Sequence, residues 1–363
     1  MGEVTLRSDG RWCATLQLGG IRRYVYGKTE REARKKLAAL ERQANVGGLA
    51  DPGKRTVGDL LDHWLEVVRP TLKARTVADY ECLCRRYIRP TLGSVRLARL
   101  TPDHVQRLYT SLQKKGLDRA PSQVHRALHR ACKLAVLWRW LSDNPCERVL
   151  APTYEPPRKE VWDRAQLRAF LDGTAEHTLY PLWVTMVATG CRLGEILGLK
   201  WANVDLTRGR IKVVGNLQRI KGEWTYSTPK THAGERTITL PQEGVAALTR
   251  QRTQQGEWRL RVGTEWQDTG LVFTGVLGQP LHHSAVAHAL TTTCERLGLP
   301  RVTPHGLRHL HASLLLDAGL PVPLVSARLG HARPSITMAI YAHKVGHDDR
   351  QAAEALAKVL GER

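Results

Sequence analysis

At residues 189–195 the chain reads TGCRLGE, and this stretch decides how the second half of the sequence is interpreted. An apolar run at 182–187 precedes it and predicts a helix, which Gly190 ends because glycine is common just past a helix terminus. A second helix starts behind it, so Arg192 stands at a junction from which its side chain can project into a cleft. Glu195 is three residues further on and can hold the guanidinium by a charged hydrogen bond. Taken alone, the pair could equally be an ordinary surface ion pair.

A second motif, PHGLRH, follows at residues 304–309. Its proline suits the first turn of a helix, and His305 and Arg308 are three residues apart, so they share a face near the helix start. A phosphate group is well placed at such a helix start. Two other interpretations are open: surface histidines without a role, or a metal site built from His305, His309 and His311. No carboxylate or cysteine completes that site at a known zinc spacing, so we expect no metal.

A third motif, LGH, stands at residues 329–331, with a tyrosine ten residues later. Gly330 ends a predicted helix that starts near residue 322, which presents His331 just beyond the helix. Tyr341 falls near the end of a further helix predicted to begin at Pro334. On its own, a tyrosine in that setting would be ordinary amphipathic packing.

The composition points to a polyanionic partner. The 363 residues include 55 lysines and arginines against 34 acidic residues, a formal net charge of +21. Such an excess favours nucleic acid, although a generally basic proteome would give the same sign. A membrane surface fits less well, because the basic residues are spread along the whole chain instead of gathered on one amphipathic helix.

Export is not predicted. The amino terminus lacks an apolar signal core, and no stretch reaches the roughly 18 apolar residues of a membrane span. The seven cysteines are scattered, and the one close pair, Cys82 and Cys84, matches no zinc or redox pattern. Free thiols in a reducing compartment are the simplest interpretation, so we expect a cytoplasmic protein that engages no membrane.

Residues 1–44 predict a small sheet followed by a helix. Alternating apolar residues at 12–18 have strand periodicity, and turn signals at 9–10 and 19–20 divide the segment into short strands. Thr29 and Glu32 have capping-box spacing and open a helix of about a dozen residues. A three-stranded sheet can lie in a DNA groove, so we expect a DNA-binding module; a solvated basic face is the alternative. Its candidate DNA contacts are Arg7, Arg11, Arg22, Arg23 and Lys28.

Residues 45–55 are rich in glycine and predict a linker. Residues 56–149 are predicted to be entirely helical, with starts at Thr56 and at Thr101, and with the second helix ending before Pro90. The basic residues of this segment suit a DNA-clamping domain, although any small helical bundle has the same pattern. Prolines mark residues 150–159 as a second linker.

Residues 160–363 are predicted to be mostly helical with one small sheet. Residues 210–214 are rich in β-formers, and residues 224–227 and 236–240 flank a polar turn and predict a hairpin. A tail helix with an apolar stripe is expected at residues 348–360. The predicted fold class is therefore a multidomain protein, mainly α with small β-sheets.

Together the motifs resemble those of the tyrosine recombinases, or phage-type integrases. The matching elements are TGCRLGE at 189–195, PKT at 229–231, HGLRH at 305–309, LGH at 329–331, and Tyr341 followed by Ala-His. Five separate elements in the right order make the resemblance specific. It extends over the whole chain, since residues 1–44 resemble the family's arm-binding domain, residues 56–149 its SAM-like core-binding domain, and residues 160–363 its catalytic domain.

The resemblance implies an enzyme that cleaves and rejoins DNA strands through a 3′-phosphotyrosyl intermediate, as a phage or mobile-element integrase. The implied catalytic set is Arg192, Lys230, His305, Arg308, His331 and Tyr341, with Glu195 in support. Tyr341 would attack the phosphorus, and Arg192 and Arg308 would bind the non-bridging oxygens, because a guanidinium stays charged and binds phosphate through two donors.

The remaining roles implied by the resemblance concern protons. Lys230 would protonate the departing 5′-oxygen, with Lys221 as the fallback candidate. His305 would accept the tyrosine proton or position the phosphate, and His331 would donate a hydrogen bond to it. These side-chain charges take the place of a metal in phosphoryl transfer, so no cofactor and no ATP are expected.

The implied partners are double-stranded DNA, at attachment core and arm sites, and further copies of the chain in a homotetramer on DNA. The tail helix at residues 348–360 would dock on a neighbouring protomer, or alternatively on its own domain. A host DNA-bending protein and an excision factor are further possible partners. Two other functions stay open: a non-catalytic DNA-binding protein of this fold, and an enzyme like type IB topoisomerases.

Overall fold

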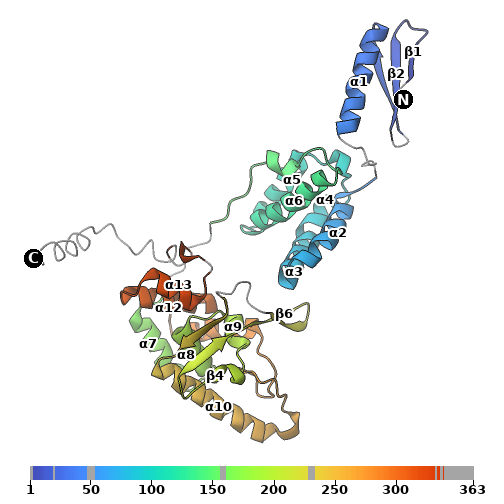
Figure 1. The fold of residues 1–363 in the computed structure, drawn as a ribbon. Helices are drawn as coiled ribbons and strands as arrows, with labels where there is room; N and C mark the ends of the chain where they lie inside the picture. Colours follow the sequence, from blue (N-terminus) through green and yellow to red (C-terminus); the bar gives the residue numbers. More distant parts are fainter. Residues whose placement is uncertain are drawn as a thin grey trace, which may run out of the picture. The chain divides into compact units, whose positions relative to one another are not determined.

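The computed structural model describes residues 3–18, 21–46, 54–155, 161–227, 234–331, 333–335 and 338. It divides into two compact units, residues 1–156 and residues 157–363 (Figure 1).

The amino-terminal part of the first unit is a three-stranded antiparallel sheet covered by one helix. The strands are β1 (Glu3–Leu6), β2 (Trp12–Leu18) and β3 (Ile21–Gly27), in the order β1-β2-β3, and the helix is α1 (Glu30–Val46). Thr29 Oγ1 accepts a hydrogen bond from the Glu32 amide at 3.2 Å, as the capping-box spacing predicted. Ala14 and Leu16 of the sheet pack against Ala33 and Leu37 of the helix in a small core. The predicted sheet and helix are confirmed, and the helix is longer than the dozen residues expected.

The rest of the first unit is helical, as predicted. Its helices are α2 (Val57–Val68), α3 (Ala74–Leu83), α4 (Arg89–Leu92), α5 (Pro102–Lys114) and α6 (Ala120–Leu137), with a π turn at Cys84–Ile88. Thr56 and Thr101 cap α2 and α5 with their side chains. Trp64 is fully buried in the core of this bundle. The helical path does not stop before Pro90, because the proline falls in the first turn of α4, where its missing N–H costs no hydrogen bond.

The second unit is built around α8. Its helices are α7 (Arg164–Asp172), α8 (Tyr180–Thr189), α9 (Leu193–Leu197), α10 (Gln242–Val262), α11 (His283–Arg296), α12 (Pro304–Asp317) and α13 (Val322–Leu329). Helices α10 and α12 both pack on α8, which is apolar on nearly every side, and α13 packs on α12 (Figure 1). A helix that is apolar all round belongs in a core, and Leu182, Trp183 and Met186 are fully buried there.

Two small sheets complete the second unit. The strands β4 (Val204–Asp205), β5 (Arg210–Val213) and β8 (Arg236–Thr239) form one sheet, and β6 (Asn216–Ile220) pairs with β7 (Glu223–Ser227) in a separate hairpin. The predicted hairpin between residues 224–227 and 236–240 is therefore wrong. Lys221 and Gly222 both have positive φ, 52° and 93°, so they form the tight turn that joins β6 to β7. β8 instead pairs with β5, with Ile211 opposite Ile238.

None of the described helices combines the length and the apolar character that crossing a membrane requires. The predicted tail helix at residues 348–360 lies outside the described residues.

Candidate active site

The junction between α8 and α9 places Arg192 and Glu195. Gly190 ends α8 in the left-handed conformation, with φ of 63°, and Arg192 directly precedes α9. Arg192 Nη1 donates to Glu195 Oε1 at 2.8 Å, and the Arg192 amide donates to Glu195 Oε2 at 2.9 Å. The side chain of Arg192 is 44% exposed whereas that of Glu195 is 7% exposed. Glu195 is thus a buried anchor that holds a guanidinium at the surface.

The start of α12 places His305 and Arg308. Thr303 caps the helix by accepting a hydrogen bond from the Gly306 amide at 3.0 Å. His305 is exposed, whereas Arg308 is 2% exposed. Arg308 Nη1 donates to the Gly190 carbonyl oxygen and Nη2 to the Leu329 carbonyl oxygen, both at 2.8 Å. Arg308 therefore connects the carboxyl ends of α8 and α13.

The end of α13 presents His331. Gly330 has φ of 67° and lets the chain leave the helix, as predicted, and the His331 amide donates to the Ser326 carbonyl oxygen at 3.1 Å. Burial lowers the pKa of His331 to about 4, and the positive charge of Arg308, then that of Arg192, acts in the same direction. His305 and His309 lower the pKa of His331 as well. Arg308 bonds to Gly190, two residues before Arg192, and to Leu329, two residues before His331, so these groups lie near one another, and the charge of His305 acts on His331 as well.

The electrostatics of this site are those of an anion receptor. Burial, followed by the charge of Arg192, lowers the pKa of the Arg308 guanidinium to about 10. Within the described part of the chain, no carboxylate lies at ion-pair distance from Arg308. A buried charge without a counter-ion is costly. Arg308 has five N–H donors, and its hydrogen bonds in the described structure engage two of them. Among its described contacts, the Arg308 guanidinium therefore keeps donors of the kind that suit an anion.

Three further residues support this site and were not predicted from the sequence. Arg236, at the start of β8, donates to Glu195 Oε2 at 2.9 Å and to the Arg328 carbonyl oxygen at 2.7 Å. Arg328 Nε donates to His311 Nε2 at 3.2 Å. His311 Nδ1 lies 2.7 Å from the Val187 carbonyl oxygen. No motif marks these positions, since their partners come from distant parts of the chain; an arginine that opens a strand was the one visible signal.

The proposed metal interpretation of the histidines is not supported by their geometry. His311 is buried and has both ring nitrogens engaged, one with Val187 and the other with Arg328. It therefore does not join His305 and His309, whose rings meet edge to face at 4.4 Å. Among the residues that the structure describes, no group of three or more histidine, cysteine, aspartate or glutamate side chains could hold a metal ion.

Two members of the predicted catalytic set cannot be placed. Lys230 and Tyr341 both lie outside the described residues. The fallback candidate Lys221 lies in the turn between β6 and β7. The structure thus brings four of the six predicted catalytic residues together and leaves the other two as predictions.

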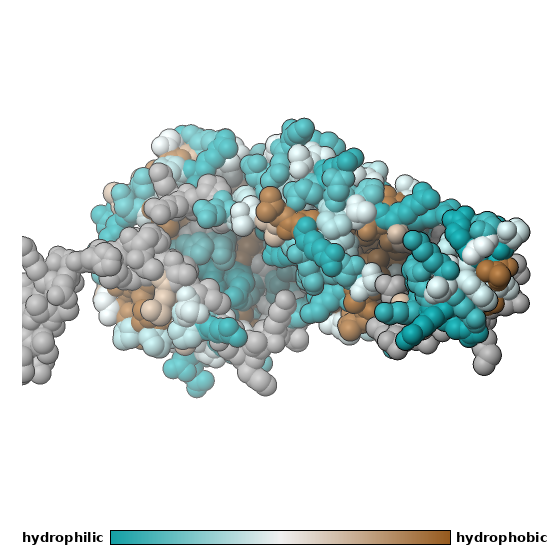
Figure 2. Space-filling model, turned by 90° about the horizontal axis from the view of Figure 1, so that it is seen from above, coloured by the Kyte–Doolittle hydropathy of each residue, from teal (hydrophilic) through white to brown (hydrophobic). Residues whose placement is uncertain are grey.

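The predicted DNA contacts of the amino-terminal sheet are only partly described. Arg7, Arg11 and Lys28 are exposed, and the guanidinium groups of Arg7 and Arg11 each lie 5.8 Å from the centre of the Tyr26 ring. The side chains of Arg22 and Arg23 fall outside the described part of the structure. On the face of the molecule shown in Figure 2, hydrophilic side chains predominate and hydrophobic ones form small scattered groups.

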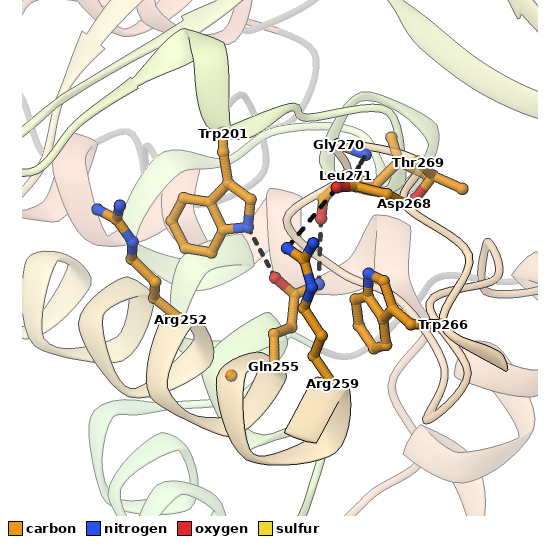
Figure 3. Close-up of a pocket in the computed structure, with 10 residues that line it drawn as sticks. Trp201, Arg252, Gln255, Arg259, Trp266, Asp268, Thr269, Gly270 and Leu271 are labelled. Atoms are coloured by element: carbon orange, nitrogen blue, oxygen red, sulfur yellow. Dashed lines mark hydrogen bonds and ion pairs between the residues drawn. The ribbon is translucent and has the colours of Figure 1, made fainter. Parts of the chain in front are cut away.

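A cleft of about 270 Å³ lies between the last turns of α10 and residues 266–271 (Figure 3). Trp201 Nε1 donates to Gln255 Oε1 at 2.7 Å, and Gln255 Nε2 donates to the Leu271 carbonyl oxygen at 3.1 Å. Gly244, near the start of α10, packs on Ala188 beside the junction between α8 and α9. At about 1.5 Å per helical residue, the cleft is roughly 18 Å further along α10. It is therefore separate from the arginine–histidine site.

Comparison with known proteins identifies the family. Residues 163–347 match the phage integrase family, and residues 56–113 match the SAM-like amino-terminal domain of phage integrases. The chain is 30% identical to a "Tyrosine recombinase XerC-like" of Caldanaerobacter subterraneus subsp. tengcongensis over 93% of this chain and 91% of that protein. It is 29% identical to an "Integrase" of Streptomyces ambofaciens, over 92% and 90% of the two chains.

Solved structures show the same fold. The Tn1549 transposon integrase, solved in complex with transposon right end DNA, superposes with a TM-score of 0.72 at 22% identity, covering 85% of this chain and all of that one. A lambda integrase from a tetramer bound to a Holliday junction superposes with a TM-score of 0.62 at 17% identity, over 93% and 94% of the two chains. The family match spans residues 163–347, and the first of these relatives matches nearly the whole chain. The chain therefore belongs to the phage integrase family of tyrosine recombinases, the enzymes of site-specific recombination.

Proposed function

We propose that this integrase cleaves DNA at the site formed by Arg192, His305, Arg308 and His331, with Tyr341 as the nucleophile. The observation that carries the proposal is the buried Arg308 guanidinium, which has no carboxylate at ion-pair distance among the described residues and retains unused donors. A DNA phosphate would supply the missing negative charge. Attack by the tyrosine oxygen on phosphorus then forms a 3′-phosphotyrosyl link and breaks the bond to the 5′-oxygen, and resealing reverses these steps.

The two arginines act on the phosphate in different ways. Arg308 is held from behind by the Gly190 and Leu329 carbonyl oxygens, so it is preorganised and stays in place when charge develops on the phosphate. Arg192 is tethered to Glu195 but half exposed, so it can meet the incoming DNA. By analogy with oxyanion donors, the loss of either guanidinium would cost roughly 3–4 kcal/mol of transition-state stabilisation.

The two histidines and the lysine donate hydrogen bonds or transfer protons. A pKa of about 4 makes His331 a neutral imidazole at pH 7, and a neutral ring donates a hydrogen bond to the phosphate without adding a further charge. His305 is exposed at the start of α12, where it can accept the tyrosine proton or position the phosphate. Lys230 would protonate the departing 5′-oxygen, with Lys221, in the β6–β7 turn, as the alternative.

The substrate and the assembly follow from the relatives. A Tn1549 integrase is solved in complex with transposon right end DNA, and lambda integrase as a dimer on a core site and as a tetramer on a Holliday junction. We infer that this chain binds double-stranded attachment-site DNA through its helical segment at residues 56–149 and through residues 160–363. We also infer that it works as a homotetramer. The amino-terminal sheet, with Arg7, Arg11, Arg22, Arg23 and Lys28, would bind arm sites, and the 348–360 tail would dock on a neighbouring protomer.

A covalent-adduct assay tests the proposal. A core-site duplex is first selected by the protein from a random pool and is then nicked next to the cleavage position, so that the cleaved strand is trapped. The wild-type protein should give a protein–DNA adduct that survives a denaturing gel, whereas Tyr341→Phe should bind the duplex and give none. An adduct in the variant would show that another residue is the nucleophile. Binding without any adduct in the wild type would favour a non-catalytic protein, and relaxation of supercoils by the monomer would favour a topoisomerase.

A further inference from the structure

Arg236 is a buried arginine at the start of β8 that contacts parts of the chain far from it in sequence. Its side chain is 8% exposed. Nη2 donates to Glu195 Oε2 at 2.9 Å and contacts Cys191 Sγ at 3.5 Å. Nη1 contacts Glu195 Oε1 at 3.5 Å and the Gly234 carbonyl oxygen at 3.3 Å, and Nε donates to the Arg328 carbonyl oxygen at 2.7 Å. All five N–H donors of this guanidinium thus have a protein partner, so none is left for a phosphate.

The first of the two partners through which Arg236 acts on the site is Glu195. Its carboxylate accepts hydrogen bonds from both Arg192 and Arg236, and Arg236 is the more deeply buried of the two. Burial opposes ionisation of Glu195, but the hydrogen bond and charge of Arg236, followed by those of Arg192, lower its pKa below the ordinary value. Arg236 thus keeps Glu195 charged and fixed, and Glu195 in turn fixes the side chain of Arg192.

The second partner of Arg236 is the last turn of α13. The Arg328 carbonyl oxygen that Arg236 binds lies next to the Leu329 carbonyl oxygen that Arg308 binds. Gly330 and His331 follow directly. Arg236 and Arg308 therefore hold the same turn from which His331 is presented.

We propose that Arg236 is a positioning residue for strand cleavage, which sets the placement of Arg192 through Glu195 and of His331 through the last turn of α13. This inference rests on the proposed function of those two residues. Arg236 itself does not touch the phosphate, which distinguishes it from Arg308. A displacement of about 1 Å at a reacting group can cost about a hundredfold in rate, so the effect belongs in the chemical step and not in DNA binding.

The test compares Arg236→Lys with a matched control, Arg208→Lys, which makes the same change at a 78% exposed arginine of the same unit. Lysine keeps the positive charge but cannot bind Glu195 and the Arg328 carbonyl oxygen together. We expect the single-turnover rate of adduct formation on the nicked duplex to fall by about ten- to a hundredfold. Core-site affinity should stay within about threefold of the wild type, and Arg208→Lys should behave as wild type in both assays.

Two further measurements separate positioning from loss of structure. The His331 ring signals in the NMR spectrum should shift in Arg236→Lys and not in Arg208→Lys. In a double-mutant cycle with Glu195→Gln, the effect of Arg236→Lys on the rate should be smaller than in the wild-type background but not zero, because the route to Arg192 is already broken whereas the route to His331 is intact. Additive effects, or a wild-type cleavage rate in Arg236→Lys, would overturn the inference.

Arg236→Lys could be tested only if it folds, so a second variant is needed for the case in which it does not. Glu195→Gln then takes its place, with the same selective loss of cleavage expected, and a wild-type rate in that variant would overturn the inference. Failure of the proposed function gives a different result, since either Tyr341→Phe would then still form the adduct or the wild-type protein would form none. A wild-type protein that cleaves through Tyr341 but tolerates Arg236→Lys would contradict only the role of Arg236.

Discussion

Gly190 and His311 are in direct contact: a Cβ atom built on Gly190 would lie 2.4 Å from His311 Cδ2. The glycine is also in the left-handed region, with φ of 63°. Two separate physical reasons therefore require glycine at the turn that presents Arg192. One is the backbone conformation, and the other is the lack of room for even a methyl group.

Gly190→Ala should destabilise the protein through both effects. The left-handed conformation costs an alanine about 1–2 kcal/mol, and overpacking against His311 and Leu329 adds about 1–3 kcal/mol. Gly116→Ala is the matched control, because Gly116 has φ of 69° but a Cβ there meets nothing within 4 Å. Urea unfolding of the two variants gives the difference. Equal losses of stability would mean that the contact with His311 is not restrictive.

His331 should titrate far below an ordinary histidine. Burial and the neighbouring positive charges lower its pKa to about 4, so we expect the ring to be neutral at pH 7 and to gain its proton only in strongly acidic solution. Arg308→Gln should raise this pKa, because the charge of Arg308 is the second cause of the shift, but not to the ordinary value, because burial is the first. NMR titration of the ring protons measures both. A midpoint near 6.5 in the wild type would contradict the arrangement of charges described here.

The buried His311 should make stability depend on pH. Its folded-state pKa, lowered to about 4 by burial, lies below the ordinary histidine pKa of about 6.5, so the unfolded chain takes up the proton first as the pH falls. The contribution of the neutral His311 to the free energy of unfolding is fully present above about pH 6.5. It is lost as the pH falls towards 4, by about 3 kcal/mol in total. The free energy of unfolding should therefore fall less between pH 7 and pH 5 in His311→Gln than in the wild type. An unchanged slope would exclude His311 as a cause.

Gly256→Ala should stabilise the protein. Gly256 lies within the 21-residue helix α10, and a Cβ there meets nothing within 4 Å. Alanine is favoured over glycine in a helix by about 1 kcal/mol, which thermal unfolding would resolve. Since Gly256 lines the cleft far from Arg192, adduct formation should not change. A loss of cleavage without a loss of stability would instead give the cleft a part in the reaction.

The sequence predicted the helix starts well, because their signals are local. Thr56 and Thr101 each cap a helix with their own side chain three residues ahead of its target amide, and Pro304 stands in the first turn of α12 as predicted. The sheet pairing was harder, because two of three candidate strands flanked a polar turn. The Lys221–Gly222 turn decided the pairing, and a lysine with positive φ is not predictable from residue preferences.

The sequence predicted the residues of the site that stand in motifs, but not the residue that holds them in place. Arg192, His305, Arg308 and His331 stand in recognisable motifs. Arg236 has no motif, and its partners Glu195 and Arg328 lie 41 and 92 positions away along the chain. Contacts over such separations depend on how the elements pack. Packing also determines that Arg308 is buried and Arg192 exposed, although both are arginines near helix starts.

The carbonyl oxygens of Gly190 and Leu329 that hold Arg308 come from segments made at very different times during translation. Arg192 leaves the ribosome more than a hundred residues before its partner guanidinium, and His331 follows later still. A nascent or truncated chain that lacks residue 308 has Arg192 but not the guanidinium that joins the carboxyl ends of α8 and α13. The ends of α8 and α13 can therefore be joined through Arg308 only after the chain has been made as far as Leu329.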